Sequence, residues 1–187
     1  MSVFSRFSLI PLVSLTLALP ALAFAPANME GPDPKLAPGK VSTRVKQGNI
    51  SETICNPRWI AKAKPTAKSS EALMKKQLKA WGYDDRDVTH YVEDHVIPVE
   101  VGGHPTDAKN QWPQSVGDKW NAATKDKLEE YVNREVCSGR MTLKEGQSVF
   151  QKGWVDVFHV YCGAQPDDVC TMPGSPVLLE NTKPVAK

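Results

Sequence analysis

The stretch HYVEDHVIPVEV, residues 90–101, limits the fold more than any other part of the sequence. Its apolar and polar residues alternate with a period of two and many are β-branched, which predicts a β-strand. Pro98 cannot donate a backbone hydrogen bond, so the strand is expected to lie at an edge or to bend. A glycine pair then favours a turn, and residues 110–112 are expected to return as a second strand. A helical pattern begins near Asp118, so the predicted order is strand, loop, strand, helix.

The remaining periodic segments are helical, and cover about residues 69–82, 118–138 and 142–158. Ser69 or Ser70 is the expected N-cap of the first helix. Thr142 and Glu145 have the spacing of a capping box for the last one. These elements predict the α+β class, as a mostly helical domain around a short two-stranded antiparallel hairpin.

The N-terminus is typical of a secretory signal peptide. Arg6 precedes an apolar run over residues 9–19, and the small residues Ala21 and Ala23 follow it. We expect cleavage after Ala23, which removes residues 1–23. The chain is therefore predicted to be exported, to the periplasm where there is an outer membrane and otherwise to the outside of the cell.

Composition divides the rest of the chain into three parts. Residues 24–50 are rich in proline, glycine and charge, and are expected to form a flexible leader. Residues 51–170 are long enough for one domain with its own hydrophobic core. Residues 171–187 contain three prolines and are expected to form a flexible tail.

Four cysteines in an exported chain indicate disulfide bonds, with three pairings to choose from. Cys162 and Cys170 flank the turn-rich segment GAQPDDV, which favours their pairing and leaves Cys55 for Cys137. A zinc site is the structural alternative, although no CxxC pair is present.

Positive charge is concentrated near the start of the predicted domain, although the net charge is only +2. From Lys35 to Lys79 there are eleven lysines and arginines but only two acids, Glu52 and Glu71. A run of this kind forms a solvated surface in many proteins, and it also suits a surface that contacts phosphates.

The strand–loop–strand–helix region also resembles a known family. EDHVIPVEVGG, Asn110 within NQWPQ, and WNAATKDKLEEYV are similar to the HNH endonucleases (His-Me finger, ββα-metal nucleases), in particular to small exported bacterial members. The resemblance covers about residues 91–136 and implies a ββα-metal core. It implies that His95 is the general base, that Asp94 is a metal-binding carboxylate, and that Asn110 braces the loop and orients His95. Imidazole titrates near neutral pH, which suits a base that activates water.

The third position of the family motif is usually a histidine on the helix, and this chain has Asn121 there. An asparagine oxygen can bind a hard cation, so Asp94 and Asn121 imply Mg²⁺ or Mn²⁺ rather than zinc. Lys125 lies one turn further along and is expected to reach a phosphate oxygen. In an ideal strand Asp94 and His95 point to opposite faces, so a twist or bulge near Pro98 is expected to turn both to one edge.

The sequence thus predicts a metal-dependent endonuclease that hydrolyses DNA, or RNA, with little sequence specificity. One alternative is a disulfide-stabilised module that binds nucleic acid or another partner and has lost catalysis with the third histidine. A further alternative is a zinc hydrolase that uses His90, Asp94 and His95, although the HExxH pattern is absent.

Overall fold

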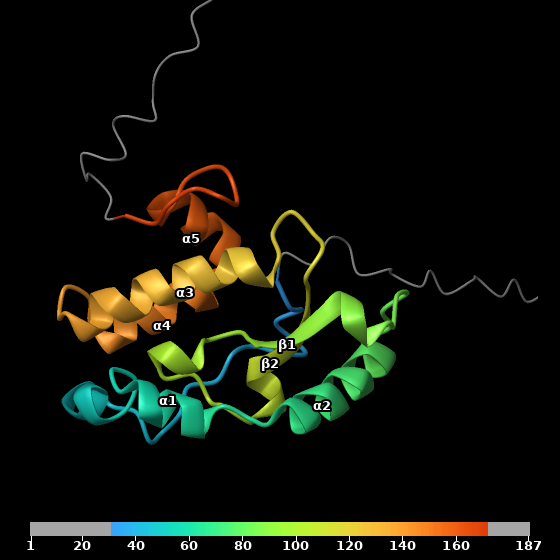
Figure 1. Ribbon diagram of the computed structural model, residues 1–187, viewed down its shortest axis with the longest axis horizontal. Coiled ribbons are helices and arrows are strands. Elements are labelled where there is room, and N and C mark those ends of the chain that lie inside the picture. Colours follow the sequence, from blue (N-terminus) through green and yellow to red (C-terminus); the bar gives the residue numbers. More distant parts are fainter. Residues whose placement is uncertain (1–30, 172–187) are drawn as a thin grey trace, which may run out of the picture.

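The structure is a computed structural model that describes residues 31–171 (Figure 1). These residues form helices α1 (Pro57–Ala63), α2 (Ala67–Ala80), α3 (Ala122–Cys137), α4 (Leu143–Gln151) and α5 (Trp154–Tyr161), and strands β1 (Tyr91–His95) and β2 (Gln111–Ser115). Short 3-10 helices are η1 (Gln47–Glu52), η2 (Val88–His90), η3 (Val99–Val101) and η4 (Ala108–Asn110). Helices together with a two-stranded antiparallel sheet confirm the predicted α+β class.

The hairpin lies between two groups of helices. Figure 1 shows α3, α4 and α5 on one side of β1 and β2, and α1 and α2 on the other. Helix α2 packs directly on both strands, while α3 contacts η3 in the loop that joins them. The chain order is β1, loop, β2, α3, as the sequence predicts.

The two strands pair antiparallel through five consecutive positions, from Tyr91 opposite Ser115 to His95 opposite Gln111. β1 ends at His95, earlier than the predicted end near residue 101, because the next backbone groups find a different partner. The amide of Ile97 donates to the side-chain Oδ1 of Asn110 at 3.0 Å. Pro98 then starts the short helix η3 instead of continuing a strand.

Some helix ends differ from the predictions, because they are set by residues that the apolar spacing does not include. Helix α2 begins after Thr66, whose side chain accepts a hydrogen bond from the Ser69 amide, and not after Ser69 or Ser70. The predicted helix over residues 142–158 is two helices, because Gly153 has φ +95° between α4 and α5. The capping box of Thr142 and Glu145 is present at the start of α4.

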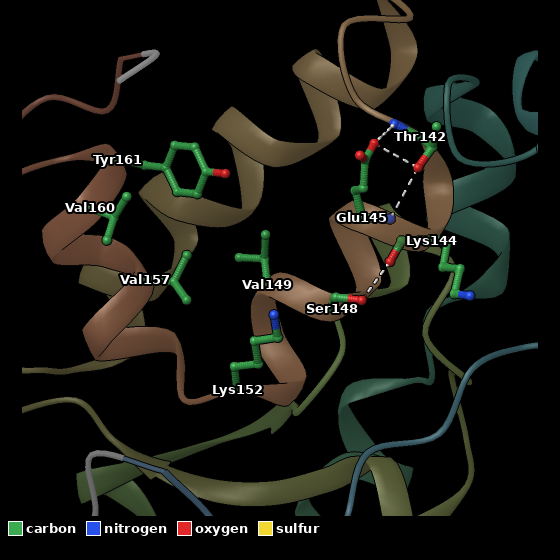
Figure 2. A pocket seen from close by; sticks show the side chains of 9 residues that line it. All are labelled: Thr142, Lys144, Glu145, Ser148, Val149, Lys152, Val157, Val160 and Tyr161. Atoms are coloured by element: carbon green, nitrogen blue, oxygen red, sulfur yellow. Dashed lines mark hydrogen bonds between the residues drawn. The ribbon is translucent and has the colours of Figure 1, made fainter. Parts of the chain in front are cut away.

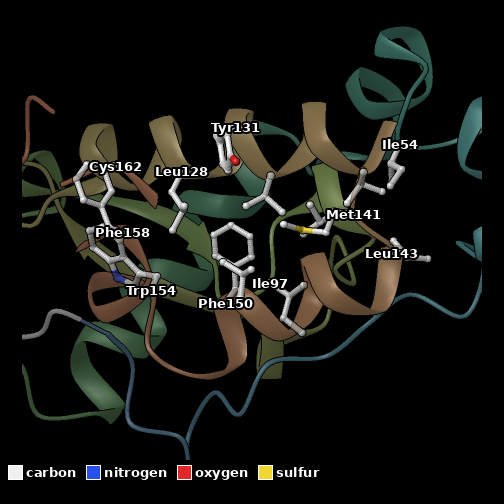
Figure 3. Close-up of a cluster of buried hydrophobic side chains, with 14 of the residues drawn as sticks. Ile54, Ile97, Leu128, Tyr131, Met141, Leu143, Phe150, Trp154, Phe158 and Cys162 are labelled. Atoms are coloured by element: carbon white, nitrogen blue, oxygen red, sulfur yellow. The ribbon is translucent and has the colours of Figure 1, made fainter. Parts of the chain in front are cut away.

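The main hydrophobic core joins α3 to α4 and α5. Figure 3 shows Leu128 and Tyr131 of α3 beside Phe150 of α4 and Trp154 and Phe158 of α5. Ile97, from the loop after β1, belongs to the same cluster. The core therefore fixes α3 relative to the segment that follows His95.

Residues 31–50 contact the domain, although the sequence analysis assigns them to a leader. Val41 forms an antiparallel bridge with Gly103, and the Gly39 amide donates to the Lys109 carbonyl at 3.0 Å. Val45 is buried in the main core. The rest of that leader, the signal peptide and all of the tail except Thr171 lie outside the described residues.

Both favoured disulfide bonds are present. Cys55, just before α1, is bonded to Cys137 at the end of α3, at a sequence separation of 82. Cys162 and Cys170 form a second, short bridge over eight residues. Both are compatible with an exported protein. Among the described helices, none has the length and apolar character needed to span a membrane.

Candidate active site

His95 lies at the end of β1 with only 9% of its surface exposed. Its Nε2 is 2.9 Å from the carbonyl oxygen of Pro105, and because a carbonyl can only accept, Nε2 carries the proton. Nδ1 then has the lone pair, and no residue in the described part of the chain donates to it. Burial lowers the pKa of His95, although the Pro105 carbonyl and Asp94 oppose this shift. The ring is therefore neutral at pH 7, with one nitrogen able to accept a proton.

Asn110 braces the loop around His95 through its backbone and does not touch the imidazole. The side chain is fully buried, and Oδ1 accepts from the amides of Lys40 and Ile97, each at 3.0 Å. Nδ2 donates to the carbonyls of Ile97 at 2.9 Å and His104 at 3.0 Å. Since His104 directly precedes Pro105, Asn110 holds the segment whose carbonyl fixes the histidine tautomer. Asn110 therefore acts on His95 through the loop that contains Pro105, and not by contact with the ring.

Asp94 and His95 send their side chains to different neighbours. The pairing of β1 with β2 contains no bulge, so the alternation of an ordinary strand is kept. Asp94 Oδ2 is 2.7 Å from Nζ of Lys125 in α3, whereas the His95 ring faces Pro105. The expected turn of both groups to one edge is therefore not seen.

Lys125 has a different position from the one predicted. Its side chain is 1% exposed, and Nζ bonds to Asp94, to Glu129 and to the His95 carbonyl at 2.8 Å. Burial by itself would lower the pKa of Lys125, but Asp94 and Glu129 raise it above its usual value. Because the side chain is buried and its ammonium group contacts three protein oxygens, Lys125 does not face the surface where a phosphate was expected to bind.

Asn121 is the N-cap of α3. Its Oδ1 accepts from the amide of Thr124 at 3.0 Å and from the Thr124 hydroxyl at 3.3 Å. This bond explains why α3 begins at Ala122 and not near Asp118. The oxygen predicted to bind a metal ion thus stabilises the helix end.

As arranged, Asp94 Oδ2 is paired with Lys125 and Asn121 Oδ1 caps α3, so these two oxygens of the predicted ligand pair contact protein groups. Within residues 31–171, no three His, Cys, Asp or Glu side chains are placed to hold a metal ion. His90, named in the zinc-hydrolase alternative, is exposed and pairs through Nδ1 with Asp85 at 2.6 Å. The structure therefore does not bring His90, Asp94 and His95 together as ligands.

Two groups near His95 were missed by the sequence analysis. The Pro105 carbonyl gives no sequence signal, because a backbone acceptor depends on the loop conformation. Glu129 of α3 was not singled out, but it is buried, and burial raises its pKa while Lys125 opposes the rise. A signal was present, because Lys125 lies three residues before the core residue Leu128, and Glu129 lies three residues before the core residue Val132.

A cleft of about 520 Å³ lies against the loop that holds His95. Its lining includes Pro105 and His104 from that loop, Trp59 and Lys62 from α1, and Arg44 from the N-terminal segment. Arg44 and Lys62 belong to the basic run between Lys35 and Lys79. Part of this run therefore faces the loop whose carbonyl fixes His95.

A second groove, of about 620 Å³, lies between α4 and α5 (Figure 2). Val149, Val157, Val160 and Tyr161 form its apolar part, and Lys152 lies at its side. None of the residues that line it is among the predicted site residues. The cleft beside Pro105 is also lined by none of them, but Pro105 and His104 in its lining bond to His95 and Asn110, so we take this cleft as the candidate site.

In comparisons with known proteins, no family model, no curated protein and no solved structure matches this chain. The resemblance to HNH endonucleases thus depends on the motif residues of the chain itself.

Proposed function

We propose that this protein is an exported nuclease of the HNH type that hydrolyses phosphodiester bonds of DNA, with RNA as a second substrate class. The observation that carries the proposal is the state of His95. Its Nε2–H is fixed by the Pro105 carbonyl, its Nδ1 has no partner among the described residues, and its pKa is lowered. A neutral, oriented imidazole is what a general base for water requires.

In the proposed reaction, Nδ1 of His95 takes a proton from the attacking water as its oxygen bonds to phosphorus. The P–O bond to the leaving sugar oxygen breaks, and that oxygen takes a proton from solvent. The imidazolium that forms keeps its Nε2–H bond to Pro105, so the ring does not need to turn during the step. Arg44 and Lys62 in the adjacent cleft supply positive charge for the nucleic-acid backbone without reading bases. Little sequence specificity is expected from such contacts.

The motif resemblance implies Mg²⁺ or Mn²⁺ as cofactor, and the cleavage test includes both ions. Because Asp94 and Asn121 are occupied by other partners, we assign no step of the reaction to a cation. Export to the periplasm or to the outside of the cell is also part of the proposal, supported by the signal-like N-terminus and the two disulfide bonds.

The test is plasmid cleavage by the oxidised chain from Phe24 onward, in Mg²⁺, Mn²⁺, Zn²⁺ or EDTA, with wild type beside His95→Ala and His90→Ala. General-base catalysis contributes about 10²- to 10⁴-fold, so His95→Ala should lose cleavage by at least that lower factor. His90→Ala removes an exposed histidine from the same hairpin region and should keep full activity. Circular dichroism and thermal melting must show that both variants are folded. Equal cleavage by wild type and His95→Ala would refute the proposal.

A second candidate is a nucleic-acid-binding module without catalysis, favoured by the pairing of Asp94 with Lys125. It predicts no cleavage under any condition, with DNA binding retained. Fluorescence anisotropy with a labelled duplex separates the two candidates. Arg44→Glu and Lys62→Glu should weaken binding in both cases, because each reverses a charge in the cleft.

A further inference from the structure

The ammonium group of Lys125 has three oxygen partners from two different elements. They are Asp94 Oδ2 at 2.7 Å and the His95 carbonyl at 2.8 Å, both from β1, and Glu129 Oε1 from α3. Nζ donates hydrogen bonds to the His95 carbonyl and to Glu129, and its contact with Asp94 is an ion pair. The Phe150 ring lies 5.4 Å from Nζ and closes another side.

This arrangement has the features of a cation site. Its three oxygens converge on one point, two of them are carboxylates, and the positive group at that point is 1% exposed. Hard divalent cations prefer oxygen ligands of this kind. Removal of a buried ammonium would leave two carboxylates close together without a counter-charge, which is strongly unfavourable. The buried ammonium of Lys125 thus balances the charge of the carboxylates around it.

We propose that Lys125 is a built-in cation, which takes the place that a divalent metal ion would otherwise occupy between Asp94 and Glu129. Lys125 also holds the backbone carbonyl of His95, so it is a positioning residue for the candidate base. The proposal rests on these contacts and not on nuclease activity, so it and the proposed function can fail separately. It has two consequences: the wild-type protein binds no divalent ion at Asp94, and loss of the ammonium creates a site that does.

The variant that tests this is Lys125→Ala. Lys125 also borders a hollow of about 290 Å³, so truncation leaves room for a hydrated ion beside the three oxygens. We expect Lys125→Ala to bind one Mn²⁺ at least tenfold more tightly than wild type, measured by calorimetric titration and by the loss of the free Mn²⁺ spectrum in electron paramagnetic resonance. Its melting temperature should rise with Mn²⁺ concentration, because an ion that binds only the folded state stabilises it.

Two controls make the result specific. Lys127→Ala removes a lysine from the exposed face of the same helix, where Nζ only contacts the Pro166 carbonyl, and should gain no Mn²⁺ binding. The double variant Lys125→Ala with Glu129→Gln removes one of the two carboxylates and should lose the gained site. A folded Lys125→Ala that binds Mn²⁺ no better than wild type would overturn the proposal.

The wild-type protein provides a measurement that does not depend on a variant folding. Mn²⁺ broadens the amide signals of nearby residues in nuclear magnetic resonance spectra. We expect the Asp94, His95 and Glu129 amides to keep their intensities at substoichiometric Mn²⁺, because Lys125 fills the position. Selective broadening of these three amides would overturn the proposal. If Lys125→Ala does not fold with or without Mn²⁺, the wild-type titration alone tests the proposal.

Discussion

Glu93, in the middle of β1, should make the protein less stable as the pH rises. Neither of its carboxylate oxygens has a hydrogen-bond partner among the described residues, and both are buried. Burial, with a smaller contribution from Asp94, raises the pKa of Glu93 from 4.5 to about 8. The folded state therefore binds this proton more tightly than the unfolded state. The stability that results is complete below about pH 4.5 and is lost as the pH rises towards 8.

The size of the effect follows from the two pKa values. A shift of one unit corresponds to about 1.36 kcal/mol, so the full difference is about 5 kcal/mol above pH 8. Between pH 5 and pH 7, the same two values give a loss of about 2.5 kcal/mol from Glu93 alone. Solvent that reaches the partly buried side chain reduces this figure, so about 1 to 2.5 kcal/mol is the range to expect.

Glu93→Gln keeps the size of the side chain but cannot ionise. We expect the variant to unfold at higher urea concentration than wild type at pH 7, with a smaller advantage at pH 5. Tryptophan fluorescence follows the transition with both disulfide bonds intact. Glu130→Gln, on the exposed face of α3, is the matched control and should follow the wild-type pH dependence. The reasoning would be refuted by parallel pH curves for wild type and Glu93→Gln.

Two further predictions concern the loop and the disulfide bonds. A Cβ at Gly103 would lie 1.8 Å from the Ile97 carbonyl oxygen, so Gly103→Ala should lower the melting temperature severely. A Cβ at Gly117 would meet no atom within 4 Å, so Gly117→Ala is the control and should melt as wild type does. Chain-entropy arithmetic assigns about 4.5 kcal/mol to the 82-residue Cys55–Cys137 bridge and about 2.5 kcal/mol to the short bridge. Urea unfolding of the two double-alanine variants checks this order, and a larger loss for the short bridge would contradict it.

Much of the fold could be predicted from the sequence, because local pattern and local structure agree. The period-two stretch gave the first strand, and the apolar spacing of Leu128 and Val132 gave the helix that follows. The end of β1 could not be predicted, because it depends on the Asn110 side chain from η4. This side chain accepts the hydrogen bond of the Ile97 amide in place of a strand carbonyl. The break at Gly153 was missed because apolar spacing continues across it.

The candidate site was predicted less completely than the fold. His95 and Asn110 lie together around one loop, but the link between them passes through the Pro105 carbonyl, which no residue type reveals. Lys125 was expected to reach a phosphate oxygen, whereas lysine is rarely buried and this one is. This lysine is buried because it pairs with Asp94 of β1, and no local sequence pattern reveals a contact between such distant parts of the chain.

The packing of residues 39–42 has a practical consequence for expression work. A fragment that begins at residue 51, the boundary suggested by composition, would lack the segment that donates to the Lys109 carbonyl and bridges Gly103. It would also leave one lone pair of Asn110 Oδ1 without its Lys40 donor. Such a fragment would retain every motif residue and still lose support on both sides of the loop that orients His95. Inactivity of that fragment would then say nothing about the chemistry, so trial boundaries belong upstream of residue 31.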